Sequence, residues 1–478
     1  MIRNLEPKGV WNNFANLNAV PRPSKKEEKV IQFAKNFGEN LGFETIVDVV
    51  GNVIIKKPAS PGMEDRKTVI LQSHLDMVCQ KNADKTFDFE TQGIEMLIEN
   101  DWVTANGTTL GADNGMGVAA IMTILEATDI AHPAIEALFT IDEETGMTGA
   151  FGLEQGILDG TILLNLDTED DDEFSIGCAG GVDTNTNYNY EAEPAKGEAF
   201  EITIRGLKGG HSGVDIALER GNANLLMNRL IWNCEDFGLR IATIDGGSLR
   251  NAIPRESVAT IVVEDAAYLA EFEKRKAILL NELAVSDPLT QITITPIELP
   301  QEVVSEVDTF RITSALKAVF NGVHKMSLTI DNLVETSSSL ARVIVADGQF
   351  ITKSLQRSSI DSGKHDVSTA VGSVFELMGC EVEYTGEYPG WEPNPNSEIL
   401  DLMQSKYATL FGEGLKVTSI HAGLECGLLG KRYPGLDMIS FGPTIKNPHS
   451  PDEKVNIKSV QKFWSFLVEV LEEIPTKN

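Results

Sequence analysis

Cysteine is scarce in this chain: 478 residues contain five, at scattered positions, and no two of them form a CxxC pair. This scarcity excludes a disulfide-stapled scaffold and a cysteine-ligated structural zinc site. It is typical of a cytoplasmic protein with reduced thiols, most of them in the core. The five residues are Cys79, Cys178, Cys234, Cys380 and Cys426.

Basic residues and long apolar runs are also in short supply. The 40 lysines and arginines are outnumbered by 71 acidic residues, which gives a net charge of −31. Nucleic acid and anionic membranes would repel such a chain, so neither is expected as a partner. No apolar run approaches the roughly 18–20 residues of a membrane span. Residues 1–20 also lack the apolar core and cleavage site of a signal peptide.

The chain is long enough for at least two domains. In its first third, predicted apolar strands at 68–72, 134–141 and 161–166 alternate with helical segments at 27–41 and 115–127. This order predicts an α/β domain with a mixed, mostly parallel sheet flanked by helices. We assign residues 1–180 to it.

The pattern changes near residue 180. Residues 198–205 alternate apolar and polar side chains, as a one-sided antiparallel strand does. Helices and strands then follow, among them a predicted helix over 309–322, and their order occurs twice, so we predict an inserted α+β domain over 181–387 with two similar halves. Residues 388–478 contain two further strands and a long terminal helix, and we predict that they complete the first domain.

Acidic and histidine side chains follow the apolar strands of the first domain. His74 and Asp76 end one strand, and side chains two apart point to the same side. The imidazole could bind a metal while the carboxylate sets its tautomer. A histidine at a strand end can equally be a hydrogen-bonded core residue.

Further carboxylates occur at comparable places. Asp113 lies in a glycine-rich turn before a helix, where it could bridge two metals or cap the helix. Glu143 and Glu144 follow a strand, and their side chains should point in opposite directions, one toward a metal and the other toward water. An acidic surface loop is the alternative, although clustered carboxylates repel one another unless cations are present.

Asp167, after the next strand, and His449, in a proline-flanked loop, complete the set. The carboxyl ends of neighbouring strands meet at one edge of an open α/β sheet, which is where such folds place their sites. Nitrogen and oxygen ligands without cysteine favour a catalytic metal site. The sequence therefore predicts a two-metal site that activates water to break a polar bond.

The segments HLD, GADNG, DEETG, NLDTED and PHS together resemble the M20 metallopeptidase family. GLKGGHSGVDI, NAIPRE and HAGLECG resemble its aminoacyl-histidine dipeptidase branch. The resemblance covers essentially the whole chain. It implies that His74, Asp113 and Asp167 hold one metal and that Asp113, Glu144 and His449 hold the other. It also implies Glu143 as general base, Asp76 as the residue that orients His74, and a cis peptide after Asp113.

For the inserted domain, the resemblance implies a lid that contacts the substrate and takes part in dimerisation. His211 would stabilise the oxyanion, Asn251 and Arg357 would bind the substrate carboxylate and carbonyl, and Gly423 would offer a backbone group. Arg255 and Glu425 are additional candidates. Asn251, Arg357 and Gly423 form the implied substrate-binding set.

The resulting expectation is a cytoplasmic dipeptidase, with two Zn²⁺ per subunit, that hydrolyses dipeptides including Xaa-His. Co²⁺ or Mn²⁺ could occupy the same ligands. A hydrolase of N-acyl amino acids would use the same site on a different amide. A carboxypeptidase for longer chains and a non-catalytic metal-binding protein are two further candidates. The expected partners are small dipeptides and a second copy of the chain in a homodimer.

Overall fold

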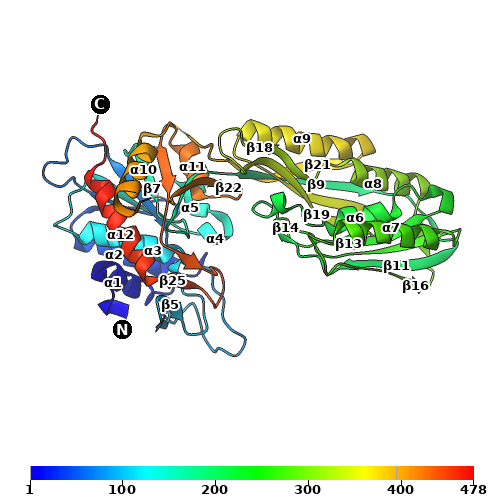
Figure 1. Ribbon diagram of the computed structural model, residues 1–478, viewed down its shortest axis with the longest axis horizontal. Helices are drawn as coiled ribbons and strands as arrows, with labels where there is room; N and C mark the ends of the chain where they lie inside the picture. Colours follow the sequence, from blue (N-terminus) through cyan, green and yellow to red (C-terminus); the bar gives the residue numbers. More distant parts are fainter. Residues whose placement is uncertain (1, 395, 413, 478) are drawn as a thin grey trace. The chain divides into compact units, whose positions relative to one another are not determined.

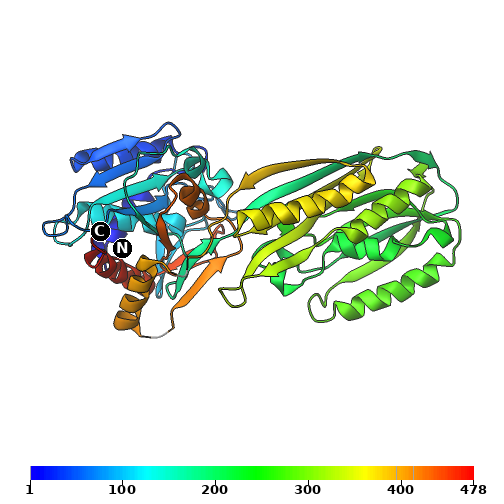
Figure 2. The same ribbon diagram turned by 90° about the horizontal axis from the view of Figure 1, so that it is seen from above.

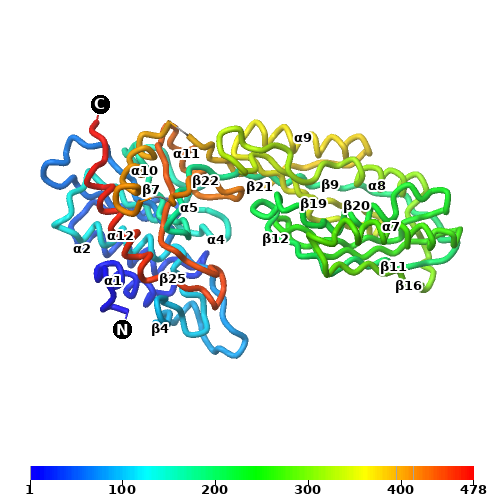
Figure 3. Tube along the Cα trace, in the orientation of Figure 1, coloured from blue at the N-terminus to red at the C-terminus, as the bar shows by residue number. Residues whose placement is uncertain are grey.

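The structure is a computed structural model that describes residues 2–394, 396–412 and 414–477. It divides into two compact units (Figure 1). The first contains residues 1–177, 393–419 and 424–478, and the second contains residues 178–392 and 420–423. The C-terminal segment thus returns to the unit that the N-terminal segment begins. Figure 3 shows both segments, the N-terminal one in blue and the C-terminal one in red.

A mixed sheet forms the centre of the first unit. Its strands pair in the order β1-β2-β6-β3-β7-β23-β8-β22. The pairs that join β6, β3, β7 and β23 are parallel, and β1, β2 and β8 are added antiparallel. The bounds are β1 Glu44–Val47, β2 Val53–Lys57, β3 Val69–His74, β6 Ile135–Thr140, β7 Ile162–Asn165, β8 Glu173–Cys178, β22 Lys416–Ile420 and β23 Asp437–Ser440.

Helices cover this sheet. α3 packs on β3 and on α1, where Trp11, Phe14 and Met116 share a fully buried core. α2 packs on β1 and β2, and α10 packs on β23 and on α12. The helices are α1 Lys8–Leu17, α2 Glu28–Asn40, α3 Ala112–Glu126, α4 Glu143–Gly146, α5 Thr148–Gly152, α10 Glu398–Phe411, α11 Glu425–Arg432 and α12 Ile457–Glu472. The predicted α/β class is therefore confirmed, with the sheet parallel at its centre.

The buried parallel strands end together. Every residue of β3, β6 and β7 is buried, and His74 at the end of β3 is level with Thr140 at the end of β6. A smaller sheet of order β24-β25-β5-β4 lies in the same unit; its strands are β4 Met96–Glu99, β5 Trp102–Ala105, β24 Ile445–Lys446 and β25 Lys454–Asn456. No helix among the described residues is both long and apolar enough to span a membrane.

The main sheet of the second unit is antiparallel, in the order β16-β11-β15-β13-β19-β20-β9-β21, with β18 paired to β19. Outside this sheet, the unit has two short antiparallel pairs, β10 with β17 and β12 with β14. Its four helices contact one another in the order α7, α6, α8, α9 and form a layer over the sheet (Figure 2). The helices are α6 Ala223–Ile231, α7 Tyr268–Glu282, α8 Glu306–Ala318 and α9 Asp361–Met378. The strands are β9 Gly180–Asn189, β10 Ala192–Pro194, β11 Glu198–Arg205, β12 Gly210–His211, β13 Arg240–Gly246, β14 Ala252–Ile253, β15 Ser257–Val263, β16 Gln291–Ile297, β17 Glu302–Val304, β18 Gly322–Met326, β19 Val334–Ala346, β20 Gln349–Ser358 and β21 Glu381–Tyr388.

This sheet consists of two halves with the same topology. In chain order one half is β11, α6, β13, β15, α7 and β16, and the other is β9, α8, β19, β20, α9 and β21. From the outer edge inward, each half places its fourth, first, third and second strands in the same sequence. The halves join through β13 and β19. The first half is inserted between β9 and α8 of the second, and the expectation of two similar halves agrees with this topology.

One predicted helix is displaced. Residues 309–322 were expected to be helical, but α8 begins at Glu306 and ends at Ala318. Ser305 caps its start by accepting a hydrogen bond from the backbone N–H of Asp308. Gly322, with φ of +115°, then begins strand β18. The apolar periodicity of this segment therefore indicated the helix but not its two ends.

Candidate active site

The predicted metal ligands lie together in the first unit. Nε2 of His74 is 3.2 Å from Oδ1 of Asp113 and 3.6 Å from Oδ1 of Asp167. Nε2 of His449 is 3.2 Å from Oδ2 of Asp113 and 3.0 Å from Oε2 of Glu144. Asp113 thus lies between two groups, each of which contains one histidine and one further carboxylate. The two oxygens of Asp113 face different histidines, which is the arrangement of a bridging ligand.

Asp76 lies behind this cluster. Its Oδ1 is 3.3 Å from Nδ1 of His74, which leaves Nε2 of that ring directed at Asp113 and Asp167. The carboxylate of Asp76 also accepts the backbone N–H groups of Glu143 at 3.1 Å and Glu144 at 3.3 Å. One buried carboxylate therefore positions a histidine and the start of the DEETG segment together.

The clustered carboxylates favour positive charge on the groups beside them. Burial lowers the pKa of His74, but Asp167, Asp113 and Asp76 outweigh it and raise the pKa well above its ordinary value. Hydrogen bonds to Asp113 and Glu144 raise the pKa of His449 to about 11. Oε1 of Glu144 is buried and has no hydrogen-bond partner among the residues that the structure describes. Convergent imidazole nitrogens and carboxylate oxygens fit divalent cations such as zinc, cobalt or manganese.

Glu143 differs from the predicted metal ligands. Among the described residues, neither His74 nor His449 forms an ion pair with it. Burial raises its pKa well above the ordinary value, and the charges of Asp167, Glu425 and Glu144 add to the effect. We expected Glu143 and Glu144 to leave a strand in opposite directions. Instead, β6 ends at Thr140, Asp142 takes a left-handed conformation and α4 begins at Glu143. Successive residues of a helix also point in different directions.

The alternative of a simple N-cap for Asp113 does not hold. Gly111 is the N-cap of α3, and Asp113 lies inside the first turn with non-helical φ and ψ. The Asp113–Asn114 peptide bond is cis, as the family resemblance implied. The side-chain amide of Asn114 donates to the carbonyl of Leu166, at 2.6 Å, and to the carboxylate of Asp167. Asn114 therefore connects the two carboxylates that flank His74.

A row of buried polar side chains lies beneath the cluster, and Glu425 is its one member that was a predicted candidate. Glu425 accepts from Nε2 of Gln72 at 2.6 Å and from the hydroxyl of Thr140 at 2.7 Å. Gln72 in turn accepts from the side-chain amide of Asn165 at 2.5 Å, and Ser440 donates to Asn165. These residues come from four adjacent strands and one helix. The only sequence signal was polar residues inside otherwise apolar strands.

In the second unit, His211 lies on β12 in a tight loop. Its Nδ1 accepts backbone N–H groups from Gly213 at 3.2 Å and Val214 at 3.0 Å. Because Nδ1 is an acceptor, the ring proton of the neutral imidazole is on Nε2. Burial and then Arg357 lower the pKa of His211 to about 4. At neutral pH the ring is therefore uncharged and presents an N–H donor.

Arg357, on β20, faces this donor. Its Nη2 is 3.4 Å from Nε2 of His211, and its Nη1 donates to the hydroxyl of Tyr388 at 2.8 Å. Two donors that converge in this way leave room for an oxygen acceptor to bind both. His421, whose Nε2 is 2.7 Å from Oγ of Ser337, lies close enough for Arg357 to lower its pKa after the main effect of burial. Neither Tyr388 nor His421 was predicted as a site residue.

Replacing Arg357 should raise the pKa of His211. In Arg357→Gln the opposing charge disappears, but burial remains, so the pKa should rise from about 4 and stay below the ordinary value near 6.5. Folding favours the neutral ring, so this histidine stabilises the fold above pH of about 6.5, and the contribution is lost as pH falls toward 4. NMR titration of the ring measures the shift. Arg250→Gln, which removes a nearby cation paired with Asp183, should leave it unchanged.

The remaining predicted residues of the second unit make fewer side-chain contacts near His211 and Arg357. Asn251 is exposed, and its backbone carbonyl accepts from the N–H of Ser212 at 2.8 Å. Gly423 lies in the loop between β22 and α11. Arg255 donates to the carbonyl of Leu207 at 2.9 Å, which gives it a structural role in the loop before His211.

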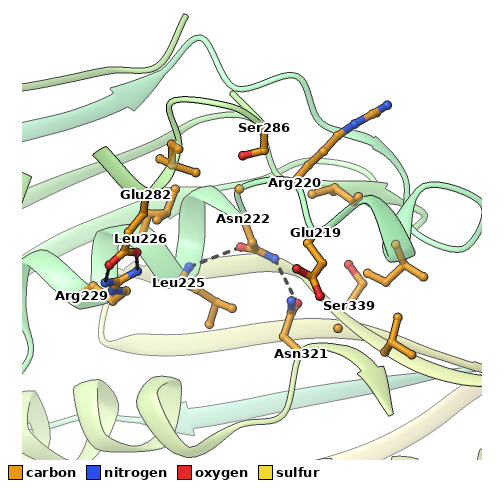
Figure 4. Close-up of a pocket in the computed structure, with 16 residues that line it drawn as sticks. Glu219, Arg220, Asn222, Leu225, Leu226, Arg229, Glu282, Ser286, Asn321 and Ser339 are labelled. Carbon is orange, nitrogen blue, oxygen red and sulfur yellow. Dashed lines mark hydrogen bonds and ion pairs between the residues drawn. The ribbon is translucent and has the colours of Figure 1, made fainter. Parts of the chain in front are cut away.

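A separate cavity of about 490 Å³ lies inside the second unit (Figure 4). Its polar lining includes Asn222, Asn321 and Ser339, and an ion pair between Arg229 and Glu282 lies at its side. It contains none of the predicted substrate-binding residues.

Comparison with known proteins places these features in a family. The model of peptidase family M20/M25/M40 matches residues 70–473. The chain is 43% identical to the cytosol non-specific dipeptidase of Escherichia coli, over 99% of both chains.

Solved structures agree with this assignment. The aminoacylhistidine dipeptidase of Vibrio alginolyticus matches with a TM-score of 0.93 and 45% identity, over 100% of this chain and 99% of that one. Aminopeptidase PepT of Bacillus cereus, at 16% identity and a TM-score of 0.61 over 98% and 99%, shares the fold. The chain therefore belongs to peptidase family M20/M25/M40 and is a peptide hydrolase.

Proposed function

We propose that this protein is a di-metal dipeptidase that hydrolyses dipeptides, Xaa-His among them. The observation that carries the proposal is the place of Asp113 between His74 and His449, with a second carboxylate beside each histidine. The relatives from E. coli and V. alginolyticus, which match over nearly the full chain, are both named dipeptidases.

His74, Asp113 and Asp167 would hold one metal ion, and Asp113, Glu144 and His449 would hold the other. We propose Zn²⁺ in both places, although the same ligands suit Co²⁺ or Mn²⁺. When bound, the ions supply Lewis acidity that lowers the pKa of water and polarises the scissile carbonyl. Asp76 keeps His74 in the tautomer that offers Nε2 to the metal.

Glu143 is the general base of the proposed mechanism. Its buried carboxylate has a raised pKa, which favours its accepting a proton from the attacking water. As the tetrahedral intermediate collapses, Glu143 returns this proton to the leaving amine. Glu144 is assigned to the metal instead, because its Oε2 is 3.0 Å from Nε2 of His449.

His211 and Arg357 are the proposed substrate-binding donors. Nε2–H of His211 would donate to the oxyanion, and the guanidinium of Arg357 would bind the substrate carbonyl and C-terminal carboxylate. The convergence of these donors within the second unit supports the proposal. Asn251 and Gly423 are further proposed contacts. Recognition of the substrate's own carboxylate would limit the length of the peptide and select dipeptides.

A substrate panel tests the proposed function. Dipeptides, including Xaa-His, should be cleaved with kcat/KM at least about tenfold above that for matched tripeptides and N-acetyl amino acids, a difference of about 1.4 kcal/mol in transition-state binding. Amine release measures each rate. Preference for N-acetyl amino acids would replace the proposal with an amidohydrolase, and equal cleavage of longer peptides would replace it with a carboxypeptidase.

We also propose a cytoplasmic location, in agreement with the cytosolic name of the E. coli relative. The homodimer stays a prediction. Light scattering after gel filtration would measure the mass against the 52.1 kDa of one chain.

A further inference from the structure

Glu453 occupies an unusual place beside the cluster. It is 2% exposed and follows His449 by four residues. Its Oε2 accepts the backbone N–H groups of Leu110 at 2.7 Å and Gly111 at 2.9 Å. Its Oε1 accepts those of Ala112 at 2.7 Å and Asp113 at 3.2 Å. One carboxylate therefore binds four consecutive amides that lead into Asp113.

Arg22 holds the same turn from its carbonyl side. It is 1% exposed, and its guanidinium donates to the carbonyl of Gly111 at 2.5 Å. The other nitrogen of the fork donates to the carbonyls of Leu75 at 3.0 Å and Asp76 at 2.9 Å. Arg22 therefore ties the segment after His74 to the turn before Asp113.

Gly111 makes this arrangement feasible. Its φ of +69° is in the left-handed region that favours glycine, and a Cβ there would collide with the guanidinium of Arg22. Burial lowers the pKa of Arg22, and the nearby negative charges of Glu453 and Asp76 oppose that effect, which favours the buried cation.

We propose that Arg22 and Glu453 form a clamp, defined as these two residues, that sets the positions of His74, Asp113 and His449 and thereby determines metal affinity. The clamp links three segments far apart in the chain, and each carries one of these ligands. It touches no ligand side chain, so its members are positioning residues. The inference rests on the proposed metal site, but it does not depend on which substrate the enzyme cleaves.

Glu453→Gln is the decisive variant because it keeps the shape of the side chain. Glutamine has one acceptor oxygen, and its NH₂ group would face two backbone N–H donors. We expect the dissociation constant for Zn²⁺ to rise about 10–100-fold, the usual effect of losing a residue that orients metal ligands. Competition with a chromophoric chelator measures this constant without substrate. KM should stay unchanged, and kcat should recover as Zn²⁺ is raised.

Glu136→Gln is the matched control. Glu136 is 3% exposed in the same unit and also accepts two backbone N–H groups, from Asp159 and Gly160. Both variants should lower the thermal midpoint of the metal-free protein, but Glu136→Gln should bind Zn²⁺ like the wild type. If Glu453→Gln is insoluble, Arg22→Lys takes its place, because a single ammonium cannot replace the guanidinium fork.

The outcomes separate the two proposals. Wild-type Zn²⁺ affinity in Glu453→Gln, or equal weakening in Glu136→Gln, overturns the clamp. Weakened affinity in Glu453→Gln alone supports it. If the wild type binds two Zn²⁺ and Glu453→Gln alone weakens that binding, but the wild type cleaves no dipeptide, the clamp stands and the proposed function fails.

Discussion

Glu143→Ala should reduce turnover by about 10²–10⁴-fold, the range that general acid–base catalysis contributes. The variant removes the carboxylate proposed to take the proton from water. It leaves the contacts of His74 and His449 with their carboxylates intact, so metal content should stay at two ions per chain. Steady-state kinetics on a dipeptide and elemental analysis of the same sample give both values.

The control for this variant is Glu154→Ala, which removes an exposed glutamate from the same unit. It should keep wild-type turnover and metal content. A Glu143→Ala enzyme with more than about a tenth of wild-type turnover would show that another group is the base. Loss of metal from that variant would instead make Glu143 a ligand.

His449→Ala should lose one metal ion. The side chain of His449 reaches Asp113 and Glu144, whereas His74 reaches Asp113 and Asp167, so only one of the two groups loses its imidazole. Metal content should fall from two ions to one per chain after dialysis. Turnover should fall by at least about 100-fold, because a missing ligand costs more than a missing outer partner.

His365→Ala provides the comparison for His449→Ala. His365 is exposed in the second unit, where Nε2 lies 2.7 Å from Glu387, and its loss should leave both ions bound. Two ions at full occupancy in His449→Ala would remove His449 from the ligand set. Equal metal loss in both histidine variants would point to a general loss of stability.

The apolar strands and the polar residues that follow them were predictable because both signals are local. Buried parallel strands such as β3 and β6 appear in the sequence as short apolar runs, and their ends show as a change to charged residues. Helix ends were less predictable. α8 starts where Ser305 caps it and stops at Ala318, because Val319 takes an extended conformation, and apolar periodicity does not encode either point.

Contacts between residues distant in the chain were not predictable, even where the residue itself was a candidate, as Glu425 was. Glu425 binds Gln72 across 353 residues, and Glu453 binds Leu110 across 343. In sequence each is one acidic residue among 71. The contacts of Tyr388 and His421 were not predictable for the same reason. Only the folded second unit places Tyr388 next to Arg357 and His421 next to Ser337.

The sequence by itself determined the types of the proposed ligands and base, because metal chemistry needs histidine and carboxylate side chains at the carboxyl ends of neighbouring strands. Only the tertiary structure decided how those groups are held. It placed Asp113 between two histidines and put Arg22 and Glu453 on either side of one glycine turn. The reason is physical: local sequence specifies where a strand ends, whereas the distance between two strand ends depends on every segment packed around them.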